Sequence, residues 1–524
     1  MIFRWFGKGK CPIIAESDTN HCEGPALLFN SLEFLLFFPA VVLVNFCLPK
    51  RVRYLWLLAA SYFFYMCWNA KYALLLLFST AVTYGCGLAL EWIKNADLPE
   101  EAKIRRKKQA VAVSFILNLS VLAWFKYVNF GLSLLQQAFS LAHVELAVPR
   151  FDILLPVGIS FFTFQALGYT MDVYRGEIYA EKNFFRYALF VSFFPQLVAG
   201  PIERSKNLLK QLAKPADFCF EDAREGVLLM LWGYFLKVVL ADRTAIFVDT
   251  VYGNIGAYPG LLMVLATFLF SIQIYCDFAG YSTIAMGAAR ILGIQLMENF
   301  DAPYLSASVA EFWRRWHISL SSWFRDYLYI PLGGSRQGKA RKYRNILIVF
   351  LLSGLWHGAD ITFCIWGGLN GIYQIIGEVT LGLRQRIGKA LGIQTGTKGH
   401  TVWPVVTTAA LVDFSWIFFR AGTTAEAFAA IRSIFTVFNP WVLFDGSVYR
   451  CGLDPKNFWL MIACIGLLFA ADLCKKRGIR IRDAIIGKPL VLRSFLIACA
   501  ISAILLFGIW GPGYDATSFI YFQF

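Results

Sequence analysis

Residues 72–92 read YALLLLFSTAVTYGCGLALEW, a run in which Glu91 is the single charged side chain. A helix needs about 20 mostly apolar residues to cross the hydrocarbon core of a bilayer. Comparable blocks lie at 32–48, 54–68, 111–124, 227–240, 261–275, 346–356, 402–419, 458–473 and 495–510. A soluble fold cannot bury so many helices that are apolar all round. The sequence therefore predicts an all-α polytopic membrane protein with roughly ten to twelve spans.

The composition agrees with a membrane location. The chain is 58% hydrophobic and only 16% charged, whereas an average soluble domain has about 25% charged residues. Tryptophan gathers at the ends of apolar blocks, at Trp56, Trp68, Trp92, Trp403 and Trp510. Amphipathic rings of this kind settle at the level of the lipid headgroups. The block ends therefore mark the two surfaces of the membrane.

The formal net charge of +15 has two interpretations, nucleic-acid binding and membrane topology. Lys and Arg lie between the apolar blocks, mainly in 50–53, 103–108, 204–214, 336–344 and 475–482. Basic clusters in such places mark the cytoplasmic ends of spans, so topology is favoured and no nucleic-acid partner is expected. By this rule residues 474–493 are cytoplasmic, and the tail from Gly511 lies on the outer side.

Residues 1–26 differ from everything that follows, because they are polar and mixed in composition. We interpret them as an N-terminal extension, and a mis-called start, with Leu27 as the true first codon, is one hypothesis for it. Residues 27–524 contain no long linker, low-complexity tract or internal repeat. They are expected to form a single membrane domain.

Two segments, 184–206 and 312–335, are too polar for simple spans and too aromatic for ordinary loops. Irregular backbone at membrane depth is tolerated only where protein buries it or water lines it. We therefore expect re-entrant segments at these two places, where sites are commonly built.

Missing motifs exclude several kinds of site. The 12 cysteines include no CxxC spacing, and no metal site is expected. The sequence has no Walker-type glycine-rich loop, so nothing indicates that ATP drives the reaction. It has no GxSxG elbow either, so a serine acyl-enzyme has no support. We expect no tightly bound cofactor.

His357 is the strongest candidate for a functional residue. It lies in SGLWHG at 353–358, inside an otherwise apolar run. An ionisable side chain at such a place is costly in lipid, and it usually faces the bundle interior or a water-filled path. A satisfied core histidine is the alternative. Gly354 and Gly358 favour function, since small residues allow close approach of a helix or a substrate.

His317 lies in a segment that mixes basic and aromatic residues, EFWRRWHISLS at 311–321. An interfacial helix with snorkelling arginines explains this pattern, and so does a polar lining for an anionic or thioester-bearing donor. Asp277 is a further acid inside an apolar run. It either orients a histidine or forms an ion pair.

Two histidines without a metal or nucleophile motif fit direct acyl transfer. A neutral imidazole can take the proton of a hydroxyl as that hydroxyl attacks a thioester. General-base assistance of this kind contributes roughly 10²–10⁴-fold to the rate.

These residues also carry a resemblance. The stretch 275–370 resembles the membrane-bound O-acyltransferases (MBOAT), most closely the bacterial branch with alginate O-acetyltransferase (AlgI) and the peptidoglycan O-acetylation proteins. The matching pieces are DFAGY at 277–281, EFWRRWH at 311–317, WFRDYLYIPLGG at 323–334 and GLWHG at 354–358. Further pieces are LFNS at 28–31, AGPIER at 199–204, ADR at 241–243 and GPGYD at 511–515. The resemblance thus covers nearly everything from Leu27 onward.

The resemblance implies an MBOAT-type multi-helix bundle around a central funnel or tunnel, in the plasma (inner) membrane of a bacterium. It implies His357 and His317 as the catalytic residues. Along the matched stretch, the implied substrate-binding residues are Asp277, Trp313, Arg314, Arg315, Trp316, Ser321, Arg325, Asp326, Trp356 and Asn370.

The implied donor is acetyl-CoA or another acyl thioester on a carrier. The implied acceptor is a cell-surface glycan, reached directly or through a secreted acetyltransferase partner, with membrane lipid around the chain.

Acetyl transfer is the first expectation, and three alternatives stay open. D-alanyl transfer to teichoic acid is one, although that relative usually lacks the IPLGG version found at 330–334. A transporter or flippase predicts paired broken segments in two related halves, and no such repeat is found. A passive scaffold predicts that both histidines can be replaced without loss. The sequence leaves the acceptor polymer open.

Overall fold

The structure is a computed structural model that describes residues 27–198, 200–390 and 398–510. Every regular element within these ranges is a helix, and no strand occurs among them. The all-α prediction is therefore confirmed. The predicted N-terminal extension at 1–26 and the outer tail from Gly511 lie outside the described residues.

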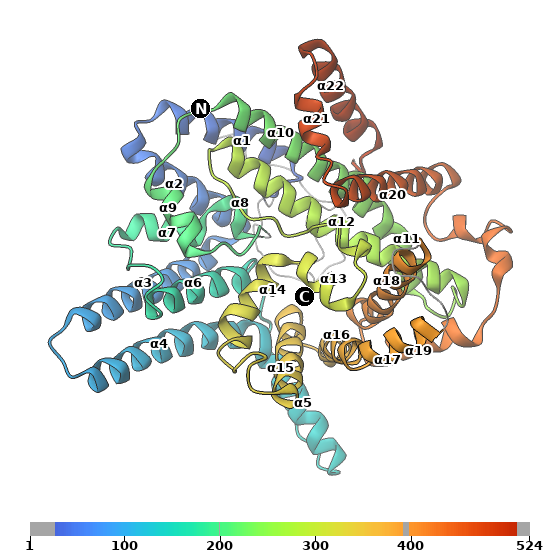
Figure 1. Ribbon diagram of the computed structural model, residues 1–524, viewed down its shortest axis with the longest axis horizontal. Helices are drawn as coiled ribbons and strands as arrows, with labels where there is room; N and C mark the ends of the chain where they lie inside the picture. The colour runs from blue at the N-terminus through green and yellow to red at the C-terminus, as the bar shows by residue number, and fades with distance from the viewer. Residues whose placement is uncertain (1–26, 199, 391–397, 511–524) are drawn as a thin grey trace.

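The N-terminal half packs around helix α6 (Figure 1). Its helices are α1 (Leu32–Cys47), α2 (Lys50–Asn69), α3 (Ala73–Asn95), α4 (Glu100–Leu122), α5 (Val128–Leu141), α6 (Ile159–Tyr174), α7 (Phe184–Ser192), α8 (Phe194–Leu197) and α9 (Ser205–Ala213). Residues 159–170 of α6 are all buried, and α6 contacts α3, α4, α7 and α9. This helix is therefore the core of the N-terminal half.

The C-terminal half is built around the long helix α12, which contacts α10, α11 and α18. Its helices are α10 (Phe220–Tyr234), α11 (Asp242–Gly253), α12 (Leu261–Ile291), α13 (Val309–Arg315), α14 (Ile318–Phe324), α15 (Lys339–His357), α16 (Ile361–Val379), α17 (Leu381–Ala390), α18 (Lys398–Arg420), α19 (Thr424–Thr436), α20 (Pro455–Lys476), α21 (Ile481–Ile486) and α22 (Leu490–Phe507). Short 3-10 turns occur at Ala70–Tyr72, Pro303–Leu305, Pro440–Leu443 and Ser447–Arg450.

Six helical stretches of the described chain are long and apolar enough to cross a membrane, by length and composition. They are Arg53–Asn95, Glu100–Leu141, Leu261–Ile291, Val402–Arg420, Pro455–Lys476 and Leu490–Phe507. The multi-pass prediction is confirmed. The count of ten to twelve spans stays a prediction, because α6 has only 16 residues and α15 begins with a basic turn.

Helices α10 and α12 approach closely because glycines face each other. A Cβ atom on Gly233 of α10 would lie 2.6 Å from the carbonyl oxygen of Gly280 on α12. One on Gly226 would lie 2.5 Å from the carbonyl oxygen of Gly287. Small residues at such crossings let backbones pack directly, which drives helix association in lipid. This crossing brings the π-helical turn Phe235–Ala241 against α12.

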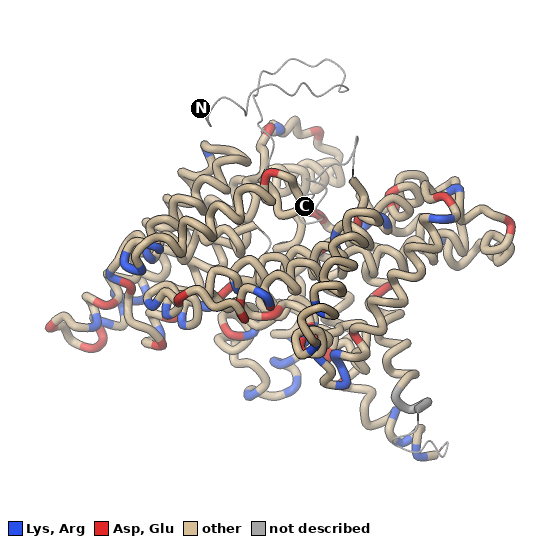
Figure 2. Tube along the Cα trace, turned by 90° about the horizontal axis from the view of Figure 1, so that it is seen from above, with Lys and Arg blue, Asp and Glu red and all other residues tan. Residues whose placement is uncertain are grey.

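Most Lys and Arg residues lie toward one side of the molecule (Figure 2). We call it the basic side, and it contains the starts of α2, α4 and α15 and the end of α20, each of which carries lysine. The positive-inside rule predicts that it is the cytoplasmic side.

The two segments expected to be re-entrant consist of short helices joined by irregular backbone. Segment 184–206 contains α7, α8 and the start of α9, and segment 312–335 contains most of α13, then α14 and a π-helical turn at Arg325–Tyr329. Residues 187–198 are all buried, as irregular backbone at membrane depth must be. The re-entrant path and the central funnel stay predictions.

Candidate active site

His357 is the last residue of α15, where the chain turns back into α16. The two helices pack closely because Gly354 lies against the carbonyl of Phe363, and Gly358 lies against the ring of the same residue. A Cβ atom at either glycine would clash with Phe363. These two glycines therefore allow α15 and α16 to approach each other closely. At the basic side, the ion pair between Lys342 and Glu378 joins the far ends of α15 and α16 at 2.5 Å.

The carboxyl end of α15 is capped by the π-helical turn Ala123–Tyr127 between α4 and α5. Lys126 Nζ donates to the carbonyl oxygens of Trp356 at 2.7 Å and His357 at 2.9 Å, and the Tyr127 hydroxyl donates to that of Leu355 at 2.7 Å. A cation at this end complements the helix dipole. Lys126 was not among the residues predicted from the sequence, although a lysine inside an apolar run was the available signal.

His317 is held in an uncommon backbone conformation. It has φ 44° and ψ 53°, in the left-handed region, at the start of α14. The N–H groups of Ile318 and Ser319 donate to the backbone and side-chain oxygens of Asn299, at 2.9 and 3.1 Å. The Asn299 side chain also donates to Ser282 Oγ on α12 at 3.2 Å. A non-glycine residue in this region persists only where its surroundings over-determine it, and Asn299 supplies that restraint.

The two imidazole rings lie near each other inside the protein. Their centroids are 6.3 Å apart, and the exposed fractions of His317 and His357 are 0% and 4%. Trp356 packs against both rings, with its centroid 5.9 Å from that of His317 and 4.9 Å from that of His357. The structure therefore brings together the two histidines and one tryptophan that the sequence singled out.

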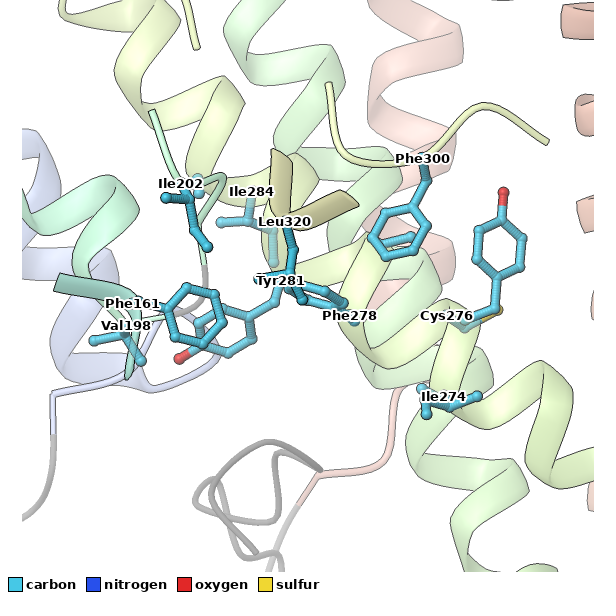
Figure 3. Close-up of a cluster of buried hydrophobic side chains, with 14 of the residues drawn as sticks. Phe161, Val198, Ile202, Ile274, Cys276, Phe278, Tyr281, Ile284, Phe300 and Leu320 are labelled. Atoms are coloured by element: carbon cyan, nitrogen blue, oxygen red, sulfur yellow. The ribbon is translucent and has the colours of Figure 1, made fainter. Parts of the chain in front are cut away.

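Aromatic side chains from four other helices enclose this pair. The ring of Phe278 on α12 meets His317 edge-on at 4.6 Å, and Phe161 of α6 stacks on it at 6.3 Å. Figure 3 shows Phe161 and Phe278 in one buried cluster with Tyr281 and Leu320. Around His357 lie Trp366 of α16 at 5.1 Å and Phe419 of α18 at 5.4 Å. These rings were not predicted from the sequence, because aromatic residues are frequent along the whole chain.

His357 is one of the residues that line a small cavity. Its lining includes Lys126, residues 155–161 at the start of α6, Val198 and Trp356, and its volume is about 40 Å³. A void of roughly 10–15 Å³ on this measure holds one water molecule. The cavity therefore has room for a group of a few heavy atoms. It lies at the opposite end of α6 from Arg175, which is on the basic side.

Trp313, Trp316 and Asn370 pack behind the aromatic rings that surround His357. Trp313 Nε1 donates to Asn370 Oδ1 at 3.1 Å, and the Asn370 amide donates to Ser415 Oγ on α18 at 3.2 Å. Trp313 also packs on Trp366, and Trp316 packs on Trp416. These predicted residues thus tie α13, α16 and α18 together around the site.

The remaining predicted residues of this stretch lie nearer the surface than the histidines. Arg315 forms ion pairs with Asp301 at 3.2 Å and Glu311 at 3.0 Å. Arg325 is exposed and pairs with Asp326 at 2.8 Å, Arg314 is exposed, and Ser321 donates to the Trp316 carbonyl. A contact of these side chains with a donor stays a prediction.

Asp277 forms an ion pair, which is one of the two roles that the sequence left open. Lys237 Nζ, in the π-helical turn Phe235–Ala241, lies 2.7 Å from a carboxylate oxygen of Asp277 and 2.8 Å from one of Asp242. All three side chains are buried. The next residue, Phe278, packs on His317. A substrate contact by Asp277 stays a prediction.

Asn299→Ala is expected to lower acyl transfer about tenfold, because it removes the side-chain hydrogen bonds to Ser319 in the His317 turn and to Ser282 on α12, each worth about 1 kcal/mol. The measurement is transfer activity at equal amounts of folded protein. Asn207→Ala is the matched control, since it removes an exposed asparagine that donates to Glu203 at 2.9 Å. Equal activity of the two variants would contradict the role of Asn299.

Comparison with known proteins shows which family this chain resembles. The family described as MBOAT, membrane-bound O-acyltransferase, matches residues 177–390. The chain is 36% identical over 447 residues to the "Probable alginate O-acetylase AlgI" of Pseudomonas putida. The aligned residues cover 84% of this chain and 87% of that protein. It is 33% identical over 445 residues to the peptidoglycan O-acetyltransferase of Helicobacter pylori, with 78% and 80% covered.

A more distant similarity links the chain to the teichoic acid D-alanyltransferase of Bacillus subtilis, with 27% identity over 301 residues, 53% of this chain and 72% of that protein. The family match includes both histidines and the α15–α16 hairpin. Its bacterial relatives and its apolar helices indicate a multi-pass protein of a bacterial inner membrane. The chain therefore belongs to the membrane-bound O-acyltransferase family and is an O-acyltransferase.

Proposed function

We propose that this chain moves an acetyl group from a cytoplasmic thioester donor to a hydroxyl group of a cell-surface glycan. The observation that carries the proposal is the buried histidine pair, with ring centroids 6.3 Å apart, beside a cavity of about 40 Å³ that His357 helps to line. A cavity of that size suits a small acyl group better than a long chain. Two of the similar proteins are named for O-acetylation of alginate and peptidoglycan.

In the proposed reaction, His357 acts as the general base. Its imidazole accepts the proton of the acceptor hydroxyl, and the hydroxyl oxygen attacks the carbonyl carbon of the thioester. The carbon–sulfur bond then breaks, the thiolate leaves, and the proton passes from His357 to the sulfur. The products are an oxygen ester and a free thiol. Proton transfer of this kind contributes roughly 10²–10⁴-fold.

His317 assists on the donor side of the same site. An imidazole N–H can donate to the thioester carbonyl oxygen as that oxygen gains negative charge, and such stabilisation is strongest where water is excluded. The aromatic rings that bury both histidines provide this exclusion. They also keep water from competing with the acceptor hydroxyl for the acyl group.

The donor and the route of delivery are part of the proposal. Acetyl-CoA or an acyl carrier would approach from the basic side, where exposed Arg314 and Arg325 favour an anionic molecule. The acceptor would approach from the opposite side, where His357 helps to line the cavity at the start of α6. Where the acceptor hydroxyl belongs instead to a secreted acetyltransferase, that partner would pass the acetyl group on to the polymer.

Mild-base release of ester-linked acids from cell-surface fractions tests the function. The comparison is between a strain that lacks this chain and the same strain complemented with it. We expect acetate to reappear in one glycan fraction of the complemented strain, which also names the acceptor. Reappearance of D-alanine would replace the acetyl proposal by D-alanyl transfer. No difference in any fraction would contradict an ester-forming role.

A further inference from the structure

A second, larger pocket lies on the basic side, away from the His357 cavity. It is formed where α3 and α4 meet the end of α6 and the loop that follows it, and its volume is about 300 Å³. Small-molecule sites begin at about this size. The proposed acyl transfer uses none of its lining residues, so its chemistry requires a separate explanation.

Three cationic side chains from three different helices or their ends line this pocket. They are Lys94 at the end of α3, Lys107 in α4, and Arg175 directly after α6. Lys94 Nζ lies 5.3 Å from the centroid of the Tyr179 ring, and the Arg175 guanidinium donates to the backbone oxygen of Asp326 at 2.8 Å. The protein thus holds Lys94 and Arg175 at the edge of a shared space, where Arg175 also lies 3.8 Å from a carboxylate oxygen of Glu177.

One acidic side chain, Glu91, also lines the pocket, and it has a structural task. Its carboxylate accepts the backbone N–H of Ala180 at 2.7 Å, which fixes the loop after α6 to α3. The lining therefore has an excess of positive charge. Lysine and arginine arranged in this way are the common ligands of phosphate groups, as a point charge and as a planar fork.

The pocket lies at the depth of the lipid headgroups. Trp92 and Tyr179 beside it have exposed fractions of 64% and 79%. Exposed aromatic rings at the end of an apolar helix mark the membrane interface. Lys94 and Lys107 belong to the hairpin of α3 and α4, whose basic end appears at the left of Figure 2.

We propose that this pocket binds the phosphate group of an anionic phospholipid headgroup. Basic pockets between membrane helices on the cytoplasmic side are suited to such headgroups. Lys94 and Lys107 contact the phosphate from α3 and α4, and Arg175 closes the pocket from α6. The binding site does not depend on the proposed acetyl transfer.

The test uses the full chain purified in detergent and the short-chain lipid dioctanoyl-phosphatidylglycerol, with bound lipid measured by native mass spectrometry. Lys94→Gln/Lys107→Gln is expected to weaken binding about 25-fold, because each basic residue near an anionic headgroup contributes about a factor of five. Lys103→Gln/Lys108→Gln is the matched control, since it removes two charges of α4 that do not line the pocket. It is expected to change binding less than about twofold.

Glycerol 3-phosphate distinguishes the two sources of phosphate. Weak competition by this soluble molecule supports a lipid, and competition as strong as that of the lipid assigns the site to a soluble phosphate ligand instead. Equal weakening by both double variants, or none by Lys94→Gln/Lys107→Gln, would overturn the proposal. The charge reversal Lys94→Glu should weaken lipid binding while the melting temperature of the protein stays unchanged. This result would separate a loss of binding from a loss of folding.

Discussion

Replacing His357 by glutamine is expected to lower acyl transfer by roughly 10²–10⁴-fold, the usual contribution of a general base. Glutamine keeps a polar side chain of similar length but cannot carry a proton away from a hydroxyl at neutral pH. The fold should tolerate the change, because the backbone of His357 is fixed by Lys126 and by the packing of Gly354 on α16. The variant therefore isolates proton transfer from folding.

The measurement is ester-linked acetate in the glycan fraction, compared between strains with equal amounts of the membrane protein. His143→Gln is the matched control, because His143 is an exposed histidine directly after α5. It should leave the esters unchanged. Unchanged esters with His357→Gln as well would reject His357 as the base, and the scaffold or transporter interpretation would then lead.

Lys237→Met is expected to destabilise the protein by about 3–5 kcal/mol, the usual result of removing one partner from a buried ion pair. Lys237 lies between the carboxylates of Asp242 and Asp277, at 2.8 and 2.7 Å, and its own exposed fraction is 0%. The variant leaves two buried carboxylates without the ammonium that compensates them. Thermal or denaturant unfolding of the purified protein measures the change.

Two further variants make this prediction specific. Lys50→Met removes an ammonium that lies 2.6 Å from Asp217 at the surface. The hydrogen bond from Lys50 lowers the pKa of Asp217, but an exposed pair of this kind is expected to change the stability of the protein very little. The triple variant Lys237→Met/Asp242→Asn/Asp277→Asn should recover most of the lost stability, because all three charges are then absent. A loss with Lys237→Met as small as with Lys50→Met would contradict the argument.

The same triple variant decides the role of Asp277. A stable and active triple variant would show that the carboxylate serves only the ion pair between α12 and the Phe235–Ala241 turn. A stable but inactive one would support the substrate contact expected from the resemblance. The two interpretations are separable because the variant keeps the side chains close to their original size.

The fold class was predictable because it depends on a local property. The hydropathy of a stretch such as 72–92 and its length relative to the bilayer decide that a helix forms and where it lies. The burial of His357 was predictable for a similar reason, since an ionisable group in an apolar run is costly in lipid and usually faces the bundle interior. The resemblance added His317, which local polarity alone left undecided between a surface helix and a site.

The partners of these residues were not predictable, because they come from distant parts of the chain. Lys126 caps a helix end 230 residues away, and Asn299 shapes the His317 turn from 20 residues before Ser319. A sequence pattern reports which side chains need a partner, but not which one the packing supplies.

The sequence by itself determined an all-α membrane protein with a buried histidine in an unusual aromatic and glycine-rich setting. The tertiary structure alone decided that the ring centroids of His317 and His357 lie 6.3 Å apart, that Asp277 pairs with Lys237, and that Gly354 allows α15 to pack on α16. The physical reason is that hydropathy acts residue by residue, whereas hydrogen bonds, ion pairs and ring contacts require two groups to meet within a few ångströms.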